Sequence, residues 1–291
     1  MKDVYQSVTD SIVSLLERDL APWRKPWADS RAIDSAMPFN AATGRHYSGI
    51  NVPILWAQAQ ETGYTCNGWL TYKQAQELGG HVRKGERGQM VVFWKFLEAK
   101  EPDENGNARA IPMARAYWVF NVAQCDGLSE TKAGILPEPV RPDNVIQWCQ
   151  RIGADIRHGG NRAFFQRSFD FIQLPRPEQF KTATSYHATA LHELTHWTGH
   201  ESRLARTFGA RFGDDAYAFE ELCAELGSAF LCASIGIENA PIDDHASYVA
   251  HWLKILKQDK RAIFTAASQA QKAATYCLEH GGNIERQAEA A

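Results

Sequence analysis

The segment His192-Glu193-Leu194-Thr195-His196 places two histidines four residues apart, with a glutamate directly after the first. Residues four apart on an α-helix point the same way, so both imidazoles can bind one metal ion from one face. Glu193 follows His192 at about 100° around the helix, so it lies beside the ion. There it can take a proton from a bound water whose pKa the metal lowers to about 7. The pattern predicts a helix and a metal site suited to peptide-bond hydrolysis.

A catalytic zinc takes three protein ligands and a water, so this site needs a third ligand. One known pattern puts a histidine six residues after His196, but position 202 is a serine. His200 lies beyond Gly199, a residue expected to end the helix, and we expect it to cap the helix or to support a ligand. The third ligand is therefore expected from a separate segment.

The segment "EELCAEL", residues 220–226, offers that ligand. Glu221 and Glu225 lie one helical turn apart, a spacing typical of zinc peptidases in which a ligand glutamate is followed by a carboxylate that orients a histidine. We expect Glu221 to bind the ion and Glu225 to orient a histidine. The reverse assignment stays open, and Glu220 is a weaker candidate. Zinc is the expected ion for two histidines and one glutamate, with Mn2+ or another divalent metal as the alternative.

A peptidase of this kind also needs a strand beside the metal helix, where an extended substrate can add to the sheet edge. The segment "FDFIQLP", residues 169–175, lies just upstream and is expected to form that edge strand. A side chain that stabilises the reacting carbonyl is usually a histidine, tyrosine or arginine. The candidates for this role are His245, Tyr248 and His251.

Length and composition limit the remaining possibilities. A chain of 291 residues is long enough for two domains. Its net charge of −3 means that any nucleic-acid role must rest on a local basic patch. Six cysteines without a C-x-x-C pair favour a reduced, cytoplasmic protein. We expect neither a signal peptide nor a membrane span, since no apolar run approaches the ~20 residues that a span requires.

The stretch "DGLSETKAGILPEPVRPD", residues 126–143, is rich in proline and glycine and is expected to link two domains, 1–125 and 144–291. The first domain is expected to be mixed, with helices and a hairpin. The second is expected to begin with a helix and a strand–turn–strand unit, followed by the metal helix and long helices. The expected helices are 3–19, 52–63, 71–80, 144–153, 184–199, 215–236 and a long or broken segment 246–280; the expected strands of the hairpin are 89–96 and 115–122.

The first domain interleaves cations with aromatic residues. Between Leu20 and Leu97, nine Lys and Arg face five Asp and Glu, and six of the nine tryptophans lie in residues 1–125. Cations along the backbone and rings under the bases are how proteins hold single-stranded nucleic acid. Trp56, Trp69, Trp94 and Trp118 are instead expected to pack in the core. The candidate DNA-binding residues are Arg24, Lys25, Trp27, Arg45, Tyr47, Arg83, Lys84, Arg87 and Lys95.

Long blocks of the chain resemble the ArdC-type antirestriction proteins of conjugative plasmids, which are also similar to an N-terminal region of some plasmid TraC-type primases. In the first domain the blocks are "INVPILWAQAQETGY", "TYKQAQELGGHVRKGERG", "VVFWKF" and "FNVAQCDGL". In the second they are "ADIRHGGNRAFF", "YHATALHELTHWTGHESRLAR", "RFGDDAYAFEELCAELGSAFL" and "WLKILKQDKRAIFTAASQAQ".

The resemblance implies an α+β protein of two domains, a mixed α/β domain that binds single-stranded DNA and a zincin-like metallopeptidase domain. It implies protection of incoming plasmid DNA from host restriction during conjugation. The metal and base positions of the family fall on His192, His196 and Glu193, whereas the acidic block does not choose between Glu221 and Glu225. The implied partners are single-stranded DNA and an unidentified protein substrate, for which a host restriction component is one candidate, with no membrane.

Two other functions stay open from the sequence. The chain could be a single-strand coat or decoy whose metal site is structural or catalytically silent. It could also be a regulatory protease whose first domain binds protein. A fourth protein ligand would indicate a structural metal site, and binding that does not depend on salt would argue against phosphate contacts.

Overall fold

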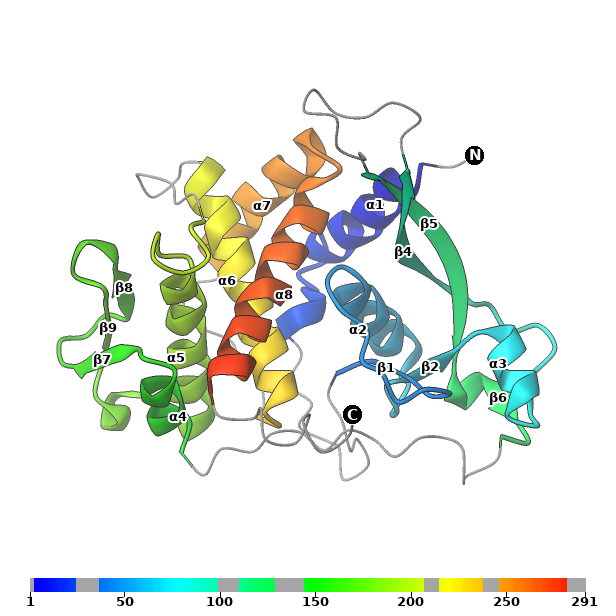
Figure 1. Ribbon diagram of the computed structural model, residues 1–291, viewed down its shortest axis with the longest axis horizontal. Coiled ribbons are helices and arrows are strands. Elements are labelled where there is room, and N and C mark those ends of the chain that lie inside the picture. Colours follow the sequence, from blue (N-terminus) through cyan, green and yellow to red (C-terminus); the bar gives the residue numbers. More distant parts are fainter. Residues whose placement is uncertain are drawn as a thin grey trace.

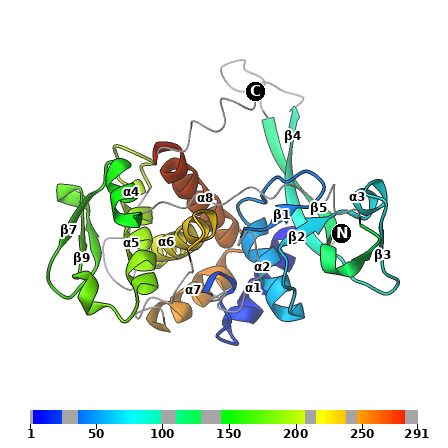
Figure 2. The ribbon, with the colours of Figure 1, turned by 90° about the horizontal axis from the view of Figure 1, so that it is seen from below.

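The computed structural model describes residues 3–24, 37–98, 110–128, 144–206, 215–237 and 246–281. A central group of helices separates a larger sheet near the N-terminus from a small sheet in the C-terminal half (Figure 1). Seen from below, the two sheets again lie at opposite ends of the molecule (Figure 2). The chain is a two-domain α+β protein. Within the described residues, none of the helices is long and apolar enough to cross a membrane.

The helices of the N-terminal half form where the apolar spacing predicted them. The Asp3 carboxylate accepts hydrogen bonds from the first backbone N–H groups of one helix. Thr71 and Gln74 form a reciprocal capping box at another, so Thr71 caps this helix. A left-handed Gly63 ends the helix between them. The elements are α1 (Val4–Leu16), a short 3-10 turn (Pro22–Arg24), α2 (Asn51–Thr62) and α3 (Tyr72–Glu77).

The larger sheet is built on the expected hairpin, whose two strands are longer than predicted. It has four strands in the order β1-β2-β5-β4, of which β1 and β2 are parallel and the other neighbours antiparallel. Of the residues between the two expected strands, 97–98 and 110–114 belong to the longer strands, and 99–109 lie outside the described residues. The strands are β1 (Phe39–Asn40), β2 (Gly68–Leu70), β4 (Gln89–Glu98) and β5 (Ala110–Asn121), and a two-stranded pair is formed by β3 (His81–Val82) and β6 (Cys125–Asp126).

One buried side chain protects the edge of this sheet. Strand β4 is an edge strand, so the outward N–H and C=O groups of its backbone need partners. The Asn51 amide supplies both for Val92: its Nδ2 donates to the Val92 carbonyl at 2.8 Å, and its Oδ1 accepts from the Val92 N–H at 2.7 Å. Asn51 therefore fixes the start of α2 against β4.

Within its described residues, the C-terminal half contains five α-helices beside a small sheet. The segment 246–280, expected to be long or broken, is broken at residues 259–261. The segment 126–143, expected to be a linker, starts within β6, and residues 129–143 lie outside the described part of the chain. The helices are α4 (Val145–Arg151), α5 (Ala183–Thr198), α6 (Asp215–Ser234), α7 (Ala246–Gln258) and α8 (Ala262–His280).

The small sheet differs from the expected strand–turn–strand unit because it has three strands. They are β7 (Asp155–His158), β8 (Phe164–Gln166) and β9 (Phe171–Leu174), in the order β7-β9-β8. The segment "FDFIQLP", expected to form the sheet edge near the metal helix, instead supplies the central strand β9. The edge strand is β8, which pairs with β9 in antiparallel fashion. The prediction was wrong because the short run before Ser168 also adopts extended backbone.

The largest buried cluster contains side chains from both halves of the chain, including Ile12 of α1, Leu194 of α5 and Phe264 of α8. Aromatic rings meet across it: Trp56 of α2 lies 5.9 Å from Phe230 of α6, measured between ring centroids. Such edge-on aromatic pairs add to the free energy gained from burial. The two domains therefore share packed apolar surface.

Candidate metal centre

Helix α5 presents the histidine pair because its ends are well defined. The Thr182 hydroxyl accepts a hydrogen bond from the Ser185 N–H at 3.0 Å, which caps the first turn. The helix therefore begins slightly before the expected Thr184 or Ser185. It ends at Gly199 as expected, although Gly199 keeps right-handed dihedral angles instead of the left-handed ones of a typical glycine cap. Within it, His192, Glu193 and His196 are all buried.

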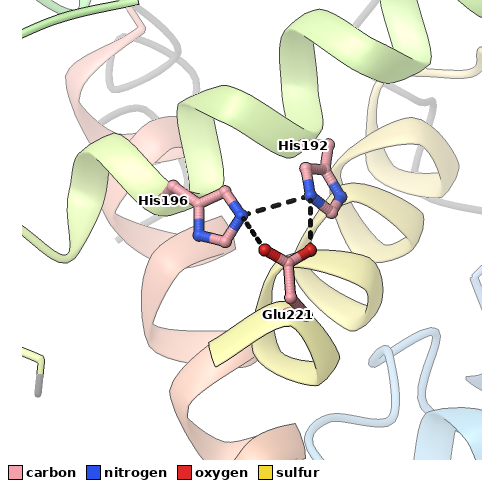
Figure 3. A group of neighbouring side chains, drawn as sticks. All are labelled: His192, His196 and Glu221. Atoms are coloured by element: carbon pink, nitrogen blue, oxygen red, sulfur yellow. Dashed lines mark hydrogen bonds and ion pairs between the residues drawn. The ribbon is translucent and has the colours of Figure 1, made fainter. Parts of the chain in front are cut away.

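Two histidines of α5 and one glutamate of α6 converge on one point (Figure 3). The Nε2 atoms of His192 and His196 lie 3.2 Å apart. Glu221 places one carboxylate oxygen 3.5 Å from the His192 Nε2 and the other 3.6 Å from the His196 Nε2. Three ligand atoms bonded to zinc at about 2.1 Å in a tetrahedron are separated by about 3.4 Å. The three side chains therefore fit a divalent ion without rearrangement.

The composition of the group points to a catalytic type of site. Two neutral imidazoles and a carboxylate are a common set of ligands for catalytic zinc, which keeps a fourth position for water or substrate. Within the part of the chain that the structure describes, the group has three members and no fourth protein ligand. The structure brings Glu221, and not Glu225, to the two Nε2 atoms.

The Nδ1 atom of each imidazole, on the side away from the metal position, faces a further glutamate of α6, a different one for each histidine. The His192 Nδ1 lies 3.6 Å from a Glu225 carboxylate oxygen. The His196 Nδ1 lies 3.1 Å from Glu220. A carboxylate at Nδ1 favours the proton on that nitrogen and leaves Nε2 free to bind a metal. The sequence pattern indicated this role for Glu225 but missed it for Glu220.

Glu220 is itself held by a buried arginine. Arg206 donates from Nε to one Glu220 oxygen at 3.0 Å and from a terminal nitrogen to the other at 2.7 Å, a bidentate pair. The same guanidinium donates to the Thr198 hydroxyl at 2.8 Å and to the Thr195 carbonyl. Arg206 therefore ties the end of α5 to α6. Nothing in the sequence around Arg206 indicated that this side chain is buried.

The site concentrates negative charge that a cation can neutralise. Burial by itself would lower the pKa of His192, but the carboxylates of Glu221, Glu225 and Glu193 raise it to about 9. Burial would raise the pKa of Glu221, but the two histidines and Tyr217 lower it to about 2. The carboxylates around His192 and Glu221 thus favour a bound positive charge at this point, which a divalent ion can supply.

Glu193 lies between the metal group and the small sheet. Burial raises the pKa of its carboxyl group. The backbone N–H of Phe165, in the middle of β8, donates to this carboxylate. Phe165 pairs in register with Ile172 of β9, and because its N–H reaches Glu193, this N–H points away from the sheet toward α5. The expected general base and the edge strand are therefore neighbours.

A tyrosine pair lies at the same site. Tyr217 is hydrogen-bonded to Glu221, four residues further along α6, and its hydroxyl is 3.5 Å from that of Tyr248 on α7. Tyr248 was one of the three expected carbonyl-stabilising candidates; His251 is half-buried on α7, and His245 lies outside the described residues. Tyr217 was not among the residues expected from the sequence, although its spacing from Glu221 puts both on one face of a helix. His200 is bonded to Ser202 and is not part of the metal group.

The helices α5 and α6 approach closely at Gly227. A Cβ atom at this position would overlap the Thr195 side chain, with the Thr195 Oγ1 only 2.9 Å away. Thr195 lies between His192 and His196 on α5, and Gly227 follows Glu225 on α6 by two residues. The small residue thus allows the approach that brings Glu221 to the histidines.

The expected DNA-binding residues are separated by the structure into several groups. Lys25 and Trp27 lie outside the described residues. Arg24 ends the 3-10 turn after α1, and Lys95 lies in β4 opposite Met113 of β5. Arg45 is exposed in the loop after β1. These positions are all in the N-terminal half.

The turn between β3 and β4 carries three of the expected cations. Arg83 is exposed but is paired with Glu86 at 2.8 Å and with Asp126 at 3.3 Å. Lys84 and Arg87 are also exposed, and among the described residues neither forms an ion pair. The turn therefore presents two uncommitted positive charges.

Two expectations about aromatic residues need correction. Tyr47, expected to stack on bases, is only 6% exposed and packs with Leu55 and Trp69 in a small core, so its ring is not available to a base. Trp94 and Trp118, expected to be core residues, are 44% and 61% exposed on the β4–β5 hairpin. The two were misassigned because strand alternation alone does not show which face the core covers. Trp56 and Trp69 are buried as expected.

The fold and the site define a two-domain protein with a zincin-like metallopeptidase domain. Residues 2–120 match the family model of the N-terminal domain of anti-restriction factor ArdC. Residues 143–269 match the model of a zincin-like metallopeptidase. Two crystal structures of the antirestriction protein ArdC from plasmid R388 are similar to the chain. The metal-free one has a TM-score of 0.81 and 44% identity, covering 97% of this chain and 98% of that one. The Mn(II)-bound one has a TM-score of 0.80 and 43% identity, covering 97% and 99%.

The chain belongs to the ArdC family of antirestriction proteins. It is 42% identical to the uncharacterized protein y4eC of Sinorhizobium fredii (strain NBRC 101917 / NGR234), over 98% of this chain and 94% of that protein. It is also 39% identical to the DNA primase TraC of Escherichia coli, over 95% of this chain but only 27% of the primase. The chain thus spans about a quarter of that primase.

Proposed function

We propose that this protein is a metal-dependent peptidase joined to a single-stranded-DNA-binding domain, and that it protects incoming plasmid DNA from host restriction during conjugation. The peptidase assignment rests on the convergence of His192, His196 and Glu221, whose ligand atoms lie at distances that fit tetrahedral coordination of an ion. Membership in the ArdC family supports the antirestriction role.

Zinc is the ion that we propose for this site. Two nitrogen ligands and one carboxylate oxygen suit zinc, whereas manganese favours sites richer in oxygen. The R388 relative has been crystallised with Mn(II), so another divalent ion is the alternative here. A zinc ion bound by these residues supplies a Lewis acid and lowers the pKa of a coordinated water to about 7.

Glu193 is the proposed general base. Its carboxylate accepts a proton from the attacking water and delivers it to the nitrogen of the departing amine. Tyr217, whose hydroxyl donates a hydrogen bond to Glu221, is the proposed donor to the oxygen of the reacting carbonyl, for which it would exchange Glu221 for the substrate. Tyr248 holds the Tyr217 hydroxyl from the other side.

Strand β8 is the proposed docking edge for an extended peptide. It is the edge of the small sheet next to α5, and its Phe165 N–H already bonds to the Glu193 carboxylate. An extended substrate that adds to β8 would hydrogen-bond to the outward Phe165 carbonyl and would take the Phe165 N–H from Glu193. The scissile bond would then lie beside both Glu193 and the metal group.

The proposed DNA contacts of the N-terminal domain begin with the exposed cations. Lys84, Arg87 and Arg45 can contact phosphates without reading sequence, which suits a protein that meets any transferred strand. Conjugation delivers DNA as a single strand, and in this proposal the protein acts in the cytoplasm, where restriction enzymes would meet that DNA. A host restriction component held near the strand is the proposed substrate.

A degradation assay tests the peptidase directly. Cell lysate of a restricting host is incubated with the zinc-loaded protein, with a chelator-treated sample and with Glu193→Ala, each with and without single-stranded DNA. The proposal expects host proteins to be lost only with zinc and an intact Glu193. Equal degradation patterns in all samples would exclude the peptidase and leave the coat or decoy function. A conjugation assay into a restricting recipient, comparing the parent with Glu193→Ala, then tests that function.

A further inference from the structure

The hairpin of β4 and β5 exposes aromatic rings that a folded protein normally buries. Phe93 is 47% exposed and Tyr117 is 44% exposed. The two rings contact each other edge to face, with centroids 5.4 Å apart and an angle of 89° between their planes. Large apolar side chains that stay exposed as a group usually mark a binding surface.

These two rings share one face of the hairpin with an arginine. In the antiparallel register, Phe93 stands opposite Arg115, and Val91 stands opposite Tyr117. Residues that face each other across an antiparallel pair point to the same side, so Phe93, Arg115 and Tyr117 lie on one face. Arg115 is exposed. We call these three residues the ring face.

The ring face is supported by rigid structure. Buried Tyr47 lies 6.5 Å from Phe93, measured between ring centroids, and Val91 and Val119 on the same face are buried beside Tyr47. The Asn51 amide fixes the neighbouring Val92 backbone. A ligand that stacks on this surface would therefore have little protein conformational entropy to remove.

The charge around the ring face favours an anionic partner. Residues 89–94 and 114–121 contain no aspartate or glutamate, and Arg115 is their only charged residue. Arg45, which is exposed, lies two residues before Tyr47. The cationic turn with Lys84 and Arg87 leads directly into β4. Along an extended strand the distance from Arg87 to Phe93 is about 20 Å, a span that several nucleotides can cover.

An anion with flat apolar groups matches this combination best. Single-stranded nucleic acid carries phosphates and unstacked bases, and each base has a face that can stack on an aromatic ring. A duplex keeps those faces stacked inside. A protein partner would offer rings or aliphatic groups but not a regular line of negative charge.

We propose that the ring face of Phe93, Arg115 and Tyr117 is the surface on which the protein stacks the bases of single-stranded DNA, while Lys84 and Arg87 hold the phosphates. The proposal rests on the proposed single-strand binding and specifies where the bases lie. It assigns base contact and phosphate contact to different residues. The β4–β5 hairpin, which carries the ring face, lies at the opposite end of the molecule from the small sheet beside α5 (Figures 1 and 2).

Two labelled oligonucleotides of equal length separate these contacts: oligo-dT and the same backbone with abasic sites. Fluorescence anisotropy measures the affinity of the full-length protein for each across a range of salt concentrations. The parent is expected to bind oligo-dT more tightly than the abasic strand. Phe93→Leu with Tyr117→Leu is expected to weaken oligo-dT binding by about tenfold or more, to abolish the preference for bases, and to keep the slope against salt.

Two matched variants complete the design. Trp118→Leu removes an exposed ring, 61% exposed, from the opposite face of the same hairpin and is expected to keep the base preference. Lys84→Ala with Arg87→Ala is expected to reduce the salt slope and to keep the preference. If the double variant Phe93→Leu with Tyr117→Leu failed to fold, photo-crosslinking of an iodouracil strand to the parent protein would still test the proposal. Adducts are expected on Phe93 or Tyr117.

The outcomes distinguish this inference from the proposed function. A parent that binds neither strand would overturn single-strand binding itself, and the ring face with it. If the parent binds oligo-dT and the variant Phe93→Leu with Tyr117→Leu keeps the preference for bases, the ring face alone would be overturned. The ring face would also be overturned if Trp118→Leu lost the preference for bases. It would be overturned as well if Phe93→Leu with Tyr117→Leu only abolished self-association or protein binding.

Discussion

At the scale of residues, three glutamates within six positions of α6 reach the two histidines in three different ways. Glu221 faces both Nε2 atoms, Glu225 supports His192, and Glu220 supports His196. The pair Glu221 and Glu225 could be predicted because residues four apart share a helix face. The role of Glu220 could not be predicted, because it depends on which side of α6 packs against His196. It also depends on the ion pair with Arg206, which precedes Glu220 by 14 positions.

The role of Glu193 predicts a variant that binds metal but does not hydrolyse peptides. Glu193→Gln keeps the size of the side chain and removes its ability to accept a proton. Hydrolysis of a peptide substrate is expected to fall by about 10²- to 10⁴-fold. Zinc affinity, measured by competition with a chromophoric chelator, is expected to stay unchanged. A large loss of zinc affinity would show instead that Glu193 is a ligand.

The buried pair of Arg206 and Glu220 predicts that stability and metal affinity can be separated. Arg206→Met leaves the Glu220 charge buried without its main partner, and the free energy of unfolding is expected to fall by about 3–5 kcal/mol. Adding Glu220→Leu removes that charge and is expected to restore most of the stability. The double variant still lacks the carboxylate behind His196, so zinc should bind about 10- to 100-fold more weakly than to the parent.

Chemical denaturation and chelator competition check both parts of this prediction. Full recovery of zinc affinity in the double variant would contradict a positioning role for Glu220. Failure to recover stability would contradict the view that an unpaired charge causes the loss in the single variant.

At the scale of elements, the metal site depends on how closely α5 and α6 pack at Gly227. Gly227→Ala places a methyl group against Thr195 and is expected to lower the free energy of unfolding by about 1–3 kcal/mol. It is also expected to weaken zinc binding, because the carboxylate of Glu221 moves away from the histidines. Adding Thr195→Ala removes the obstructing atoms and is expected to restore both. No recovery in the double variant, by denaturation and chelator competition, would mean that the helix contact is not the cause.

The elements also show where sequence patterns are sufficient. Long helices such as α1 and α6 were predicted almost to their ends, because the spacing of their apolar residues indicates them, and at α1 the Asp3 cap adds to this signal. The order of strands in the small sheet could not be predicted. Three strands of three or four residues are too short for the alternation of apolar and polar residues to show which strand is central. The exposed rings of Phe93 and Tyr117 were likewise hidden, since a run of aromatic residues reads as a core strand.

At the scale of the whole molecule, the sequence suggested two domains joined by a linker, and the structure adds a shared core. Trp23 and Trp56 of the N-terminal half contact Trp252 and Phe230 of the C-terminal half. Ion pairs flank this contact, including Lys260 with Asp3 at 2.6 Å. Such long-range packing could not be read from local periodicity.

The shared core predicts that the halves stay together after the chain is cut. A protease site introduced between residues 129 and 143 is cleaved in the folded protein. The fragments are expected to elute as one species in size-exclusion chromatography and to melt in a single thermal transition, because the apolar cluster joins them. The same sample in denaturant should separate, which shows that cleavage is complete. Two peaks under native conditions would indicate independent domains.

We propose that α5 and α6 form an open metal centre beside a general base. A crystal structure of the zinc-loaded protein, with anomalous scattering at the zinc edge, would locate the ion and its ligands. We predict one zinc ion bonded to His192, His196 and Glu221 at about 2.0–2.2 Å, with solvent in the fourth position within hydrogen-bonding reach of Glu193. A fourth protein ligand, or an ion bound elsewhere, would rule out an open catalytic centre at this site.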